Sequence, residues 1–547
     1  MRRNLPCHSV YHDTVLTNEN QRSVHHDACK RETTVSQAAP ADLLHHIIEY
    51  QSVHRPTKPA LWWEGQASSF AELQGVVTRI AERLAANGSI GDRIAVLGWN
   101  SPTFLHLIYS ASAAGKILVP LNARLAPAEL AHQLEASGAR LLFSDQSLLQ
   151  TLQAHPDFPT NLQTICLDSE LEAWLHSAKT ATLPKPLADQ PAWILYTSGS
   201  TGRPKGAVLS HRSLMAGLAS ASLARPVQSD DRYYYPFPLF HVSAHNVVLQ
   251  HLYGASVVLS RSFDAADTIK ACRDLQVTSM SLAPTMIGLL LNHPTFNAND
   301  LKGVRTIGYG ASAMPTDLLQ RLLSETQVGL CQSYGMTELS GSVAFLTEAD
   351  HQRAALDTPA LLQSVGRPLP TAKILLIDND GEESAEGEIV VKAQQCMSGY
   401  WNDPKASALA IEDGWLRTGD IGRIDDAGYL YIVDRKKDMI LSGGENIASR
   451  EIENVLRRHP AIADCAVIGL PEPKWGECAC AVLCLATETS EDELIAHCRA
   501  SLAKFKVPKQ WFRTDCLPLN AAGKVDKPLL RQQLERPMDT GTLSYLS

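Results

Sequence analysis

The 547-residue chain has no apolar run that approaches the roughly 18 residues of a membrane span. Its first residues include Arg2 and Arg3, but no apolar segment follows them, which argues against a secretory signal. The 12 cysteines are scattered and form no Cys-x-x-Cys pair, so a zinc site is not expected. We expect a cytoplasmic chain without an integral membrane segment.

An excess of positive charge is also missing. The formal net charge is −9, whereas a nucleic-acid-binding protein shows a basic field. The chain is 45% hydrophobic and 20% charged, which is ordinary for a globular enzyme with a sizeable core. No nucleic-acid partner is therefore expected, although local sites for small anions remain compatible with this charge.

The most informative stretch present is Tyr196-Thr-Ser-Gly-Ser-Thr-Gly-Arg-Pro-Lys-Gly206. Apolar residues flank it on both sides, which predicts a loop between two strands. Its glycines leave backbone N–H groups uncovered, and its hydroxyls add further donors, a combination that suits phosphate. Lys205 supplies a compact positive charge. The spacing differs from a Walker A loop, and a plain polar hairpin rarely needs so many donors.

The rest of the chain alternates between strand and helix patterns. Ser69 and Glu72 form a capping box ahead of apolar residues at helical spacing, and short apolar strands follow. This βαβ alternation predicts α/β architecture with layered, mostly parallel sheets and helices. Residues 365–432 instead predict strands joined by tight turns, in a small β-barrel-like subdomain. After Asp434-Arg-Lys-Lys-Asp438 the pattern predicts a compact α+β unit.

The motifs occur in an order that resembles the AMP-forming adenylating enzymes: acyl-CoA synthetases, luciferases and peptide-synthetase adenylation domains. The resemblance covers roughly residues 41–535. It implies a flexible extension at 1–40, a large adenylating domain at 41–436, a small mobile lid domain at 437–537 and a tail at 538–547. Lys437 matches the hinge between the two domains.

The resemblance assigns the nucleotide site residue by residue. It implies that Tyr334 stacks on adenine, that Thr337 binds the α-phosphate and that Glu338 helps to hold Mg²⁺. The residues that it places against ATP or coenzyme A are Thr197, Ser198, Gly199, Ser200, Thr201, Gly202, Lys205, Gly310, Ala311, Ser312, Tyr334, Asp420, Arg435, Gly443 and Gly444. Asp420 and Arg435 match the ribose contacts, and Gly443 and Gly444 the pantetheine path. Lys524, in Asn520-Ala-Ala-Gly-Lys524, matches the catalytic lysine.

The acid site is expected around His241, Ser243, Tyr309 and Met336. By resemblance His241 lies near the acyl group, and Tyr309 shapes the acyl pocket. Amino-acid-activating relatives carry Phe-Asp-x-Ser where this chain has Phe240-His-Val-Ser243. Without that carboxylate, a buried substrate ammonium would be unpaired and costly, so α-amino acids are disfavoured.

The resemblance implies an acid–thiol ligase that uses ATP, Mg²⁺ and coenzyme A. A carboxylic acid would be converted to acyl-AMP with release of pyrophosphate, and then to acyl-CoA. An acyl-AMP ligase that loads a carrier protein shares the adenylating motifs and stays open, as does a nucleotide-sensing protein without activity. Fatty, arylpropenoic and polycyclic acids all remain open, and so does a homodimer.

Overall fold

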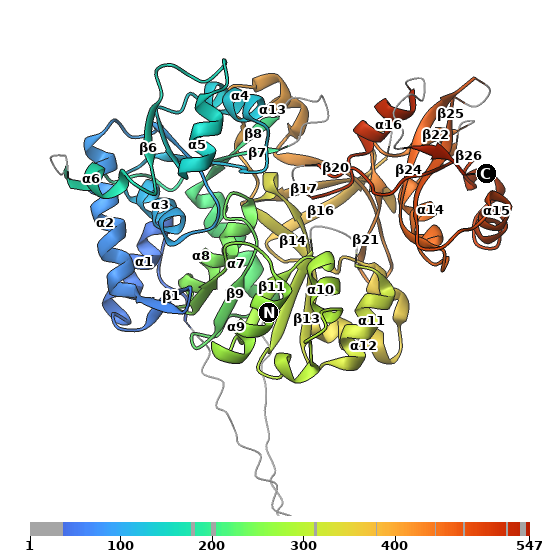
Figure 1. Ribbon diagram of the computed structural model, residues 1–547, viewed down its shortest axis with the longest axis horizontal. Helices are drawn as coiled ribbons and strands as arrows, with labels where there is room; N and C mark the ends of the chain where they lie inside the picture. Colours follow the sequence, from blue (N-terminus) through green and yellow to red (C-terminus); the bar gives the residue numbers. More distant parts are fainter. Residues whose placement is uncertain are drawn as a thin grey trace, which may run out of the picture. The chain divides into compact units, whose positions relative to one another are not determined.

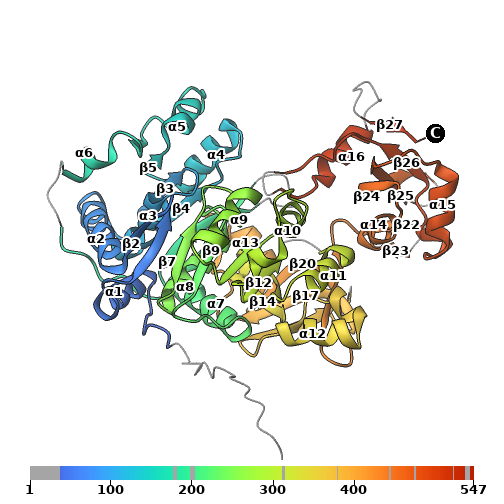
Figure 2. The same cartoon turned by 60° about the horizontal axis from the view of Figure 1, so that its bottom comes forward.

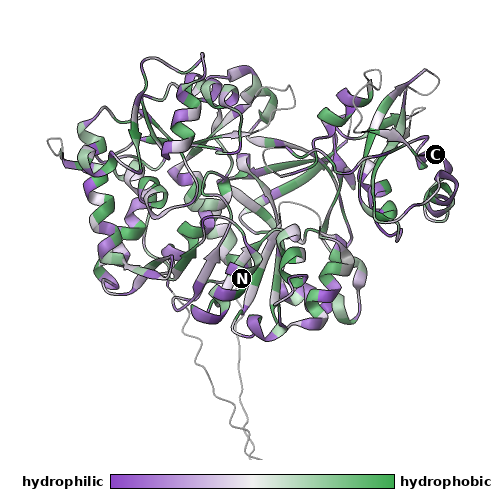
Figure 3. Ribbon diagram, in the orientation of Figure 1, coloured by the Kyte–Doolittle hydropathy of each residue, from purple (hydrophilic) through white to green (hydrophobic). Residues whose placement is uncertain are grey.

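Four β-sheets organise the part of the chain described by the structure, which is a computed structural model. The described residues are 37–176, 181–197, 204–310, 314–378, 380–442, 445–473, 476–520, 523–535 and 543–546. Apolar residues concentrate on the strands and on one side of most helices (Figure 3). The predicted extension at 1–40 lies almost wholly outside these residues.

The first sheet has seven strands in the order β18-β8-β7-β4-β3-β5-β6. Its central strands are parallel and buried on both faces, because the crossover helices cover the sheet. The strands are β3 (Arg93–Leu97), β4 (Ile117–Leu121), β5 (Leu141–Ser144), β6 (Gln163–Cys166), β7 (Pro191–Thr197), β8 (Lys205–Ser210) and β18 (Gly399–Tyr400). The helices are α2 (Phe70–Ala86), α3 (Pro102–Ala113), α4 (Pro127–Ser137), α5 (Gln146–Gln153) and α6 (Leu171–His176).

The second sheet has nine strands in the order β15-β14-β13-β12-β11-β9-β10-β1-β2. Its strands are β1 (Pro59–Trp63), β2 (Gln66–Ser69), β9 (Arg232–Tyr235), β10 (Ser256–Leu259), β11 (Ser279–Leu282), β12 (Thr306–Gly310), β13 (Gly329–Met336), β14 (Gly341–Leu346) and β15 (Arg367–Pro368). Its helices are α1 (Leu44–His54), α7 (His211–Ala224), α8 (His245–Leu252), α9 (Ala265–Asp274), α10 (Pro284–Leu291), α11 (Thr316–Glu325) and α12 (Glu348–Leu356). Helix α12 packs against β13, and Figures 1 and 2 both show it next to α11.

The two faces of this second sheet belong to different apolar cores. Along β9, Tyr233 and Tyr235 join the core shared with the seven-stranded sheet, whereas Tyr234 joins a separate core with Met280 and Ile307. The cause is the two-residue period of a strand, which sends successive side chains to opposite faces. The face that carries Tyr233 and Tyr235 is called the inner face below.

The third sheet is antiparallel and contains five strands, in agreement with the predicted β subdomain. Its strands are β16 (Ala372–Ile377), β17 (Glu386–Ala393), β19 (Ile411–Glu412), β20 (Trp415–Ile424) and β21 (Leu430–Arg435), and helix α13 (Pro404–Ala410) precedes β19. The turn after β21 contains Lys437, which is exposed.

The last sheet has six strands and apolar cores of its own. It consists of β22 (Ile440–Ser442), β23 (Glu445–Ile447), β24 (Ile462–Glu472), β25 (Gly476–Leu485), β26 (Gln510–Arg513) and β27 (Ser544–Tyr545), with α14 (Ser449–Leu456), α15 (Glu491–Arg499) and α16 (Lys527–Glu535). The segment predicted as a tail therefore includes a strand, since β27 pairs with the edge of β26 and Leu546 is buried.

The α/β fold class with a small C-terminal α+β unit is confirmed by this architecture and by the solved structures compared below. Within the described residues, no helix is both long and apolar enough to cross a membrane. The domain boundaries drawn from the sequence stay predictions.

Candidate functional site

The predicted phosphate loop joins two antiparallel strands, as expected. Thr197 at the end of β7 faces Lys205 at the start of β8. The ammonium of Lys205 lies 5.4 Å from the ring centroid of Tyr400. The loop residues Ser198, Gly199, Ser200, Thr201 and Gly202 lie outside the described residues, so their contacts with phosphate stay a prediction.

Glu338 joins three segments that are far apart in sequence. It lies in the short 3-10 helix η3 (Thr337–Leu339) after β13 and is buried. Its Oε1 accepts hydrogen bonds from the Thr197 hydroxyl at 3.0 Å and the Tyr400 hydroxyl at 3.1 Å. Among the described residues no donor is bonded to Oε2 of Glu338. A carboxylate oxygen of this kind, next to the phosphate hairpin, fits the oxygen ligands that Mg²⁺ prefers.

Tyr400 was missed by the sequence analysis. It occupies β18, which pairs with β8 and so lies beside the hairpin. Burial raises the pKa of its hydroxyl, and the negative charge of Glu338 raises it further, so the hydroxyl remains a donor. An aromatic residue after a glycine carries no local signal for this role, because its partner is 62 positions away.

The residues predicted to contact adenine and ribose lie in contact with one another in the structure. The Tyr334 hydroxyl donates to Oδ2 of Asp420 at 2.7 Å, and Nε of Arg435 lies 3.4 Å from Oδ1 of the same carboxylate. Asp420 and Arg435 are direct partners across β20 and β21. Burial and the charge of Asp420 hold the pKa of Tyr334 well above its usual value. Ala311 and Ser312 lie outside the described residues, and Gly310 ends β12.

His241 and Ser243 lie at the 3-10 helix η1 (Val242–Ala244), with His241 at its N-cap. Burial, together with the positive charges of Arg124 and Lys524, lowers the pKa of His241 to about 4. The imidazole is therefore neutral near pH 7. The hydroxyl of Ser243 lies 3.0 Å from that of Tyr235. Met336, half-buried, directly precedes Thr337 at the end of β13.

The structure places Tyr309 away from the inner face, and its expected role in the acyl pocket stays a prediction. Its side chain is buried among the apolar residues under α11 and α12, away from the inner face. Its hydroxyl lies 2.8 Å from Nε2 of His351 and 3.3 Å from Oε1 of Gln332. The reason is strand alternation: Gly308 and Gly310 occupy the inner face, so Tyr309 between them points to the other.

Lys524 is held in a tight turn. The Asn520 backbone N–H donates to the Lys524 carbonyl at 2.7 Å, and Gly523 adopts φ 76°, which favours glycine. Lys524 is exposed to solvent, but desolvation of its ammonium by the surrounding chain lowers its pKa, the charge of Arg435 lowers that pKa further, and the charge of Asp420 raises it. The ammonium is thus within electrostatic reach of the ribose residues. Gly443 and Gly444 lie outside the described residues.

Asp434, read from the sequence only as part of a charged break, is a buried connector. Its Oδ2 accepts from the backbone N–H of Ser449 at 2.5 Å and from the Ser449 hydroxyl at 2.8 Å. It therefore caps the start of α14 from the end of β21, three residues before Lys437. Lys527 donates to the same Ser449 hydroxyl at 2.6 Å.

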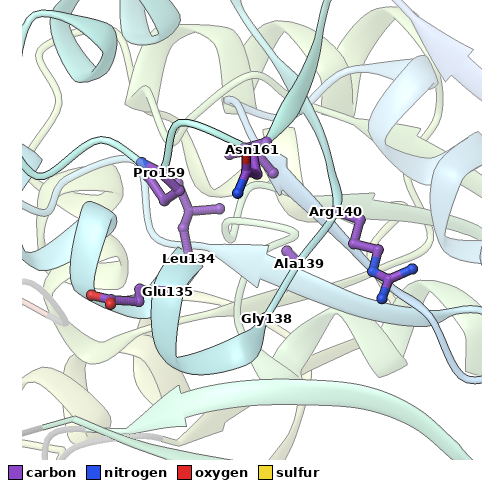
Figure 4. A pocket seen from close by; sticks show the side chains of 8 residues that line it. Leu134, Glu135, Gly138, Ala139, Arg140, Pro159 and Asn161 are labelled. Carbon is purple, nitrogen blue, oxygen red and sulfur yellow. The ribbon is translucent and has the colours of Figure 1, made fainter.

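A shallow hollow between the end of α4 and the segment before β6 lies apart from these residues (Figure 4). It is lined by Leu134, Glu135, Gly138, Ala139, Arg140, Pro159, Asn161 and Leu162. None of the predicted site residues lines it. It is open to solvent and offers no chemistry related to the motifs.

Comparisons with known proteins identify the family of this chain. Residues 48–401 match the family described as AMP-binding enzyme, and residues 451–524 match the AMP-binding enzyme C-terminal domain. Feruloyl-CoA synthase of an Amycolatopsis species is 35% identical over 506 residues, covering 87% of this chain and 96% of that protein. A fatty acid–[acyl-carrier-protein] ligase of Streptomyces coeruleorubidus is 34% identical over 514 residues, covering 90% and 98%.

The structure of o-succinylbenzoate CoA synthetase from Bacillus subtilis, in complex with its acyl-adenylate intermediate, is similar with a TM-score of 0.81 and 32% identity. The match covers 92% of this chain and 98% of that one. These matches identify the chain as an AMP-forming ligase. The chain belongs to the AMP-binding enzyme family, as an AMP-forming acyl-CoA synthetase of the adenylate-forming superfamily.

Proposed function

We propose that this synthetase activates a fatty or aromatic carboxylic acid at the residues described above and transfers it to coenzyme A. The observation that carries this proposal is the meeting of Thr197, Glu338 and Tyr400 beside the phosphate hairpin. Tyr334, Asp420 and Arg435 form a second group that suits a nucleoside. The two groups are linked by β13, which carries Tyr334 and ends next to Glu338.

In the first half-reaction the acid carboxylate attacks the α-phosphorus of ATP, and pyrophosphate leaves. Repulsion between anions dominates this barrier, so positioning and positive charge accelerate the step. Lys205 and Lys524 supply positive charge, and Asp420 accepts the ribose hydroxyls, for which a two-oxygen acceptor is suited. Mg²⁺, when bound through Glu338, would neutralise charge on the phosphates.

The acid is expected on the inner face, next to His241 and Ser243. A neutral His241 carries no positive charge to pair with a substrate carboxylate, and neither side chain offers a negative charge to pair with an ammonium. Amino acids are therefore expected to be poor substrates.

In the second half-reaction the coenzyme A thiol attacks the carbonyl carbon of acyl-AMP, and AMP leaves. The small domain proposed at 437–537 would change its position between the two steps about the turn at Lys437. Gly443 and Gly444 would then line the pantetheine path. The large adenylating domain is proposed at 41–436.

A carrier protein is the alternative acceptor. The Streptomyces coeruleorubidus ligase, whose name specifies an acyl-carrier protein, is as similar as the CoA-forming relative. Comparing coenzyme A with a phosphopantetheinyl carrier protein, at equal concentration of thiol, would separate the two acceptors.

The central test is exchange of labelled pyrophosphate into ATP across a panel of carboxylic acids. We expect exchange only when a suitable acid is present, and thioester only when coenzyme A is added. Absence of exchange with every acid, in a folded preparation, would favour a nucleotide-sensing protein.

We also propose that the protein is located in the cytoplasm and forms a homodimer. The described cysteines are all free thiols, as a reducing compartment would keep them. Light scattering coupled to size exclusion would measure the oligomeric state, and fractionation of cells would measure the location.

A further inference from the structure

Arg225 is a buried arginine whose partners are all neutral. It directly follows α7, and only 8% of its surface is exposed to solvent. Nη1 donates to the Ser281 hydroxyl at 2.6 Å, and Nη2 donates to the Met280 carbonyl at 2.7 Å. The guanidinium carbon lies 5.2 Å from the ring centroid of Tyr233. Among the described residues no carboxylate forms an ion pair with this side chain.

Gly308 makes room for this guanidinium. A Cβ atom on Gly308 would lie 2.4 Å from Nη1 of Arg225, closer than real Cβ contacts. Gly308 has no positive φ, so its backbone conformation does not call for glycine. The missing side chain therefore serves the close approach of the arginine. Gly308 and Gly310, two positions apart on β12, lie on the inner face.

Three connections place Arg225 next to the acid site. Along β9, the rings of Tyr233 and Tyr235 are 6.2 Å apart, and the Tyr235 hydroxyl lies 3.0 Å from that of Ser243. The positive charge of Arg225 also helps to lower the pKa of the buried His245, which directly follows η1. On β12, Arg225 packs against Gly308, two residues before Gly310.

We propose that Arg225 is a specificity-determining residue that binds a second carboxylate, carried by the acid at the end away from its reacting carboxyl group. This inference rests on the proposed function and narrows its substrate class to acids with a distal anion. The acid would extend from the Lys524 and His241 end of the site, past Ser243 and Tyr235, toward the guanidinium.

The physical reason is the cost of an unpaired buried charge. Serine and carbonyl oxygens satisfy N–H groups, but they do not neutralise the charge of the guanidinium. A carboxylate would do both, because its two oxygens match the planar fork of arginine. An acid that ends in a methyl group would leave the charge unpaired and exclude water from it.

A purely structural role would give a different result. Arg225 lies at the C-terminal end of α7, where the carbonyl groups carry partial negative charge that favours a cation. If this is its whole contribution, replacing it would lower stability and would affect all acids alike. The test must therefore compare kcat/KM between different acids for each variant, and not only the activity of each variant with one acid.

The experiment uses the full chain with saturating ATP and coenzyme A, and measures kcat/KM for AMP release. Matched acids are compared in pairs: saturated acids of six to twelve carbons against their α,ω-dicarboxylic counterparts, and 3-phenylpropenoic acid against its 4-carboxy derivative. The monomethyl ester of each diacid keeps the oxygens and removes the charge. In at least one pair we expect the diacid to exceed its matched monoacid by tenfold or more, and to exceed its ester.

Arg225→Met keeps the length of the side chain and removes the charge. It should lower kcat/KM for the preferred diacid by roughly tenfold to a hundredfold, leaving the monoacid unchanged or improved, because a buried polar site rejects a mismatched partner strongly. Arg225→Lys should restore part of the preference. Arg232→Met is the matched control. Arg232 is also a partly buried arginine, but it lies at the start of β9, at the opposite end of this strand from Tyr235.

The outcomes separate the two proposals. Activation of monoacids with no diacid preference in any pair would overturn the role of Arg225 and leave the proposed function standing. Equal losses for both members of a pair in Arg225→Met would also overturn it. Failure of every acid to release AMP would contradict the proposed function itself and the inference with it.

Discussion

The hydroxyl of Tyr334 donates a hydrogen bond to Oδ2 of Asp420 at 2.7 Å, across 86 positions of sequence. This bond joins the end of β13 in the nine-stranded sheet to β20 in the antiparallel sheet. Asp420 receives a second contact at its other oxygen, from Arg435 at 3.4 Å. The carboxylate is thus positioned from two sides before a nucleotide arrives, which reduces the ordering required on binding.

Tyr334→Phe should therefore weaken ATP binding with little change in the chemical step. The ring is retained, while Asp420 loses one donor and gains freedom to rotate. Hydrogen bonds to charged groups contribute about 1.5–3 kcal/mol, and we expect the lower end, or roughly a tenfold rise in the KM for ATP. Initial rates at varied ATP measure the effect. Tyr334→Ala should be worse, and equal KM values for wild type and Tyr334→Phe would refute the positioning role.

Tyr309→Phe should act on stability and not on the choice of acid. His351 donates from Nδ1 to the Thr347 carbonyl, so its buried Nε2 accepts from the Tyr309 hydroxyl. Removing that hydroxyl leaves Nε2 unsatisfied, at a cost of about 1–3 kcal/mol in the free energy of unfolding. Denaturant titration measures this. A changed ranking of acids, with unchanged stability, would return Tyr309 to the acyl pocket.

Local patterns predicted the elements well because their causes are local. Ser69 and Glu72 form the expected capping box at α2, and the loop after Thr197 joins two antiparallel strands. Long-range partners were harder to predict. Tyr400 and Arg225 act through residues more than 50 positions away, and no spacing rule connects them.

The direction of one side chain and the last short strand were harder to predict, for two different reasons. Tyr309 was expected at the pocket by resemblance, but one position along a strand reverses the direction of a side chain. Ser544–Tyr545 was expected in a tail, because two residues carry too little pattern to indicate a strand.

Acid should destabilise the fold because several buried histidines remain neutral. At His251, Nε2 donates to the Ala60 carbonyl at 3.0 Å, so Nδ1 accepts from the Tyr109 hydroxyl at 2.8 Å. Burial lowers the pKa of His251 to about 4 in the folded state, against about 6.5 in an unfolded chain. Unfolding therefore takes up a proton between these values, and stability falls as the pH drops from 6.5 to 4.

We expect the melting temperature to fall steeply over this window, and less steeply in His251→Gln, which cannot take up that proton. His176→Gln is the control, because His176 is exposed. Thermal unfolding at pH 7, 6, 5 and 4.5 measures the slope. Parallel curves for wild type and His251→Gln would show that His251 does not contribute to the acid sensitivity.

Lys524 should act in adenylation and not in thioester formation. Its ammonium lies within electrostatic reach of Asp420 and Arg435, the predicted ribose contacts, where it can approach the α-phosphate and the attacking carboxylate. Lys524→Ala should reduce acid-dependent pyrophosphate exchange by about two to three orders of magnitude, the effect of losing a charge-stabilising donor. The same variant, supplied with synthetic acyl-AMP and coenzyme A, should still form much of the thioester.

Two further variants are compared with Lys524→Ala: a control, and a variant expected to show the opposite effect. Lys504→Ala, at an exposed lysine of the same C-terminal unit, should leave both half-reactions unchanged. A bulky residue in place of Gly444 should keep the exchange and lose the transfer, since it would obstruct the proposed pantetheine path. If Lys524→Ala and the Gly444 variant instead lose both half-reactions in parallel, a single arrangement of the chain performs all of the chemistry. The proposed change of domain position about Lys437 would then be wrong, whereas activation of the acid by ATP would remain.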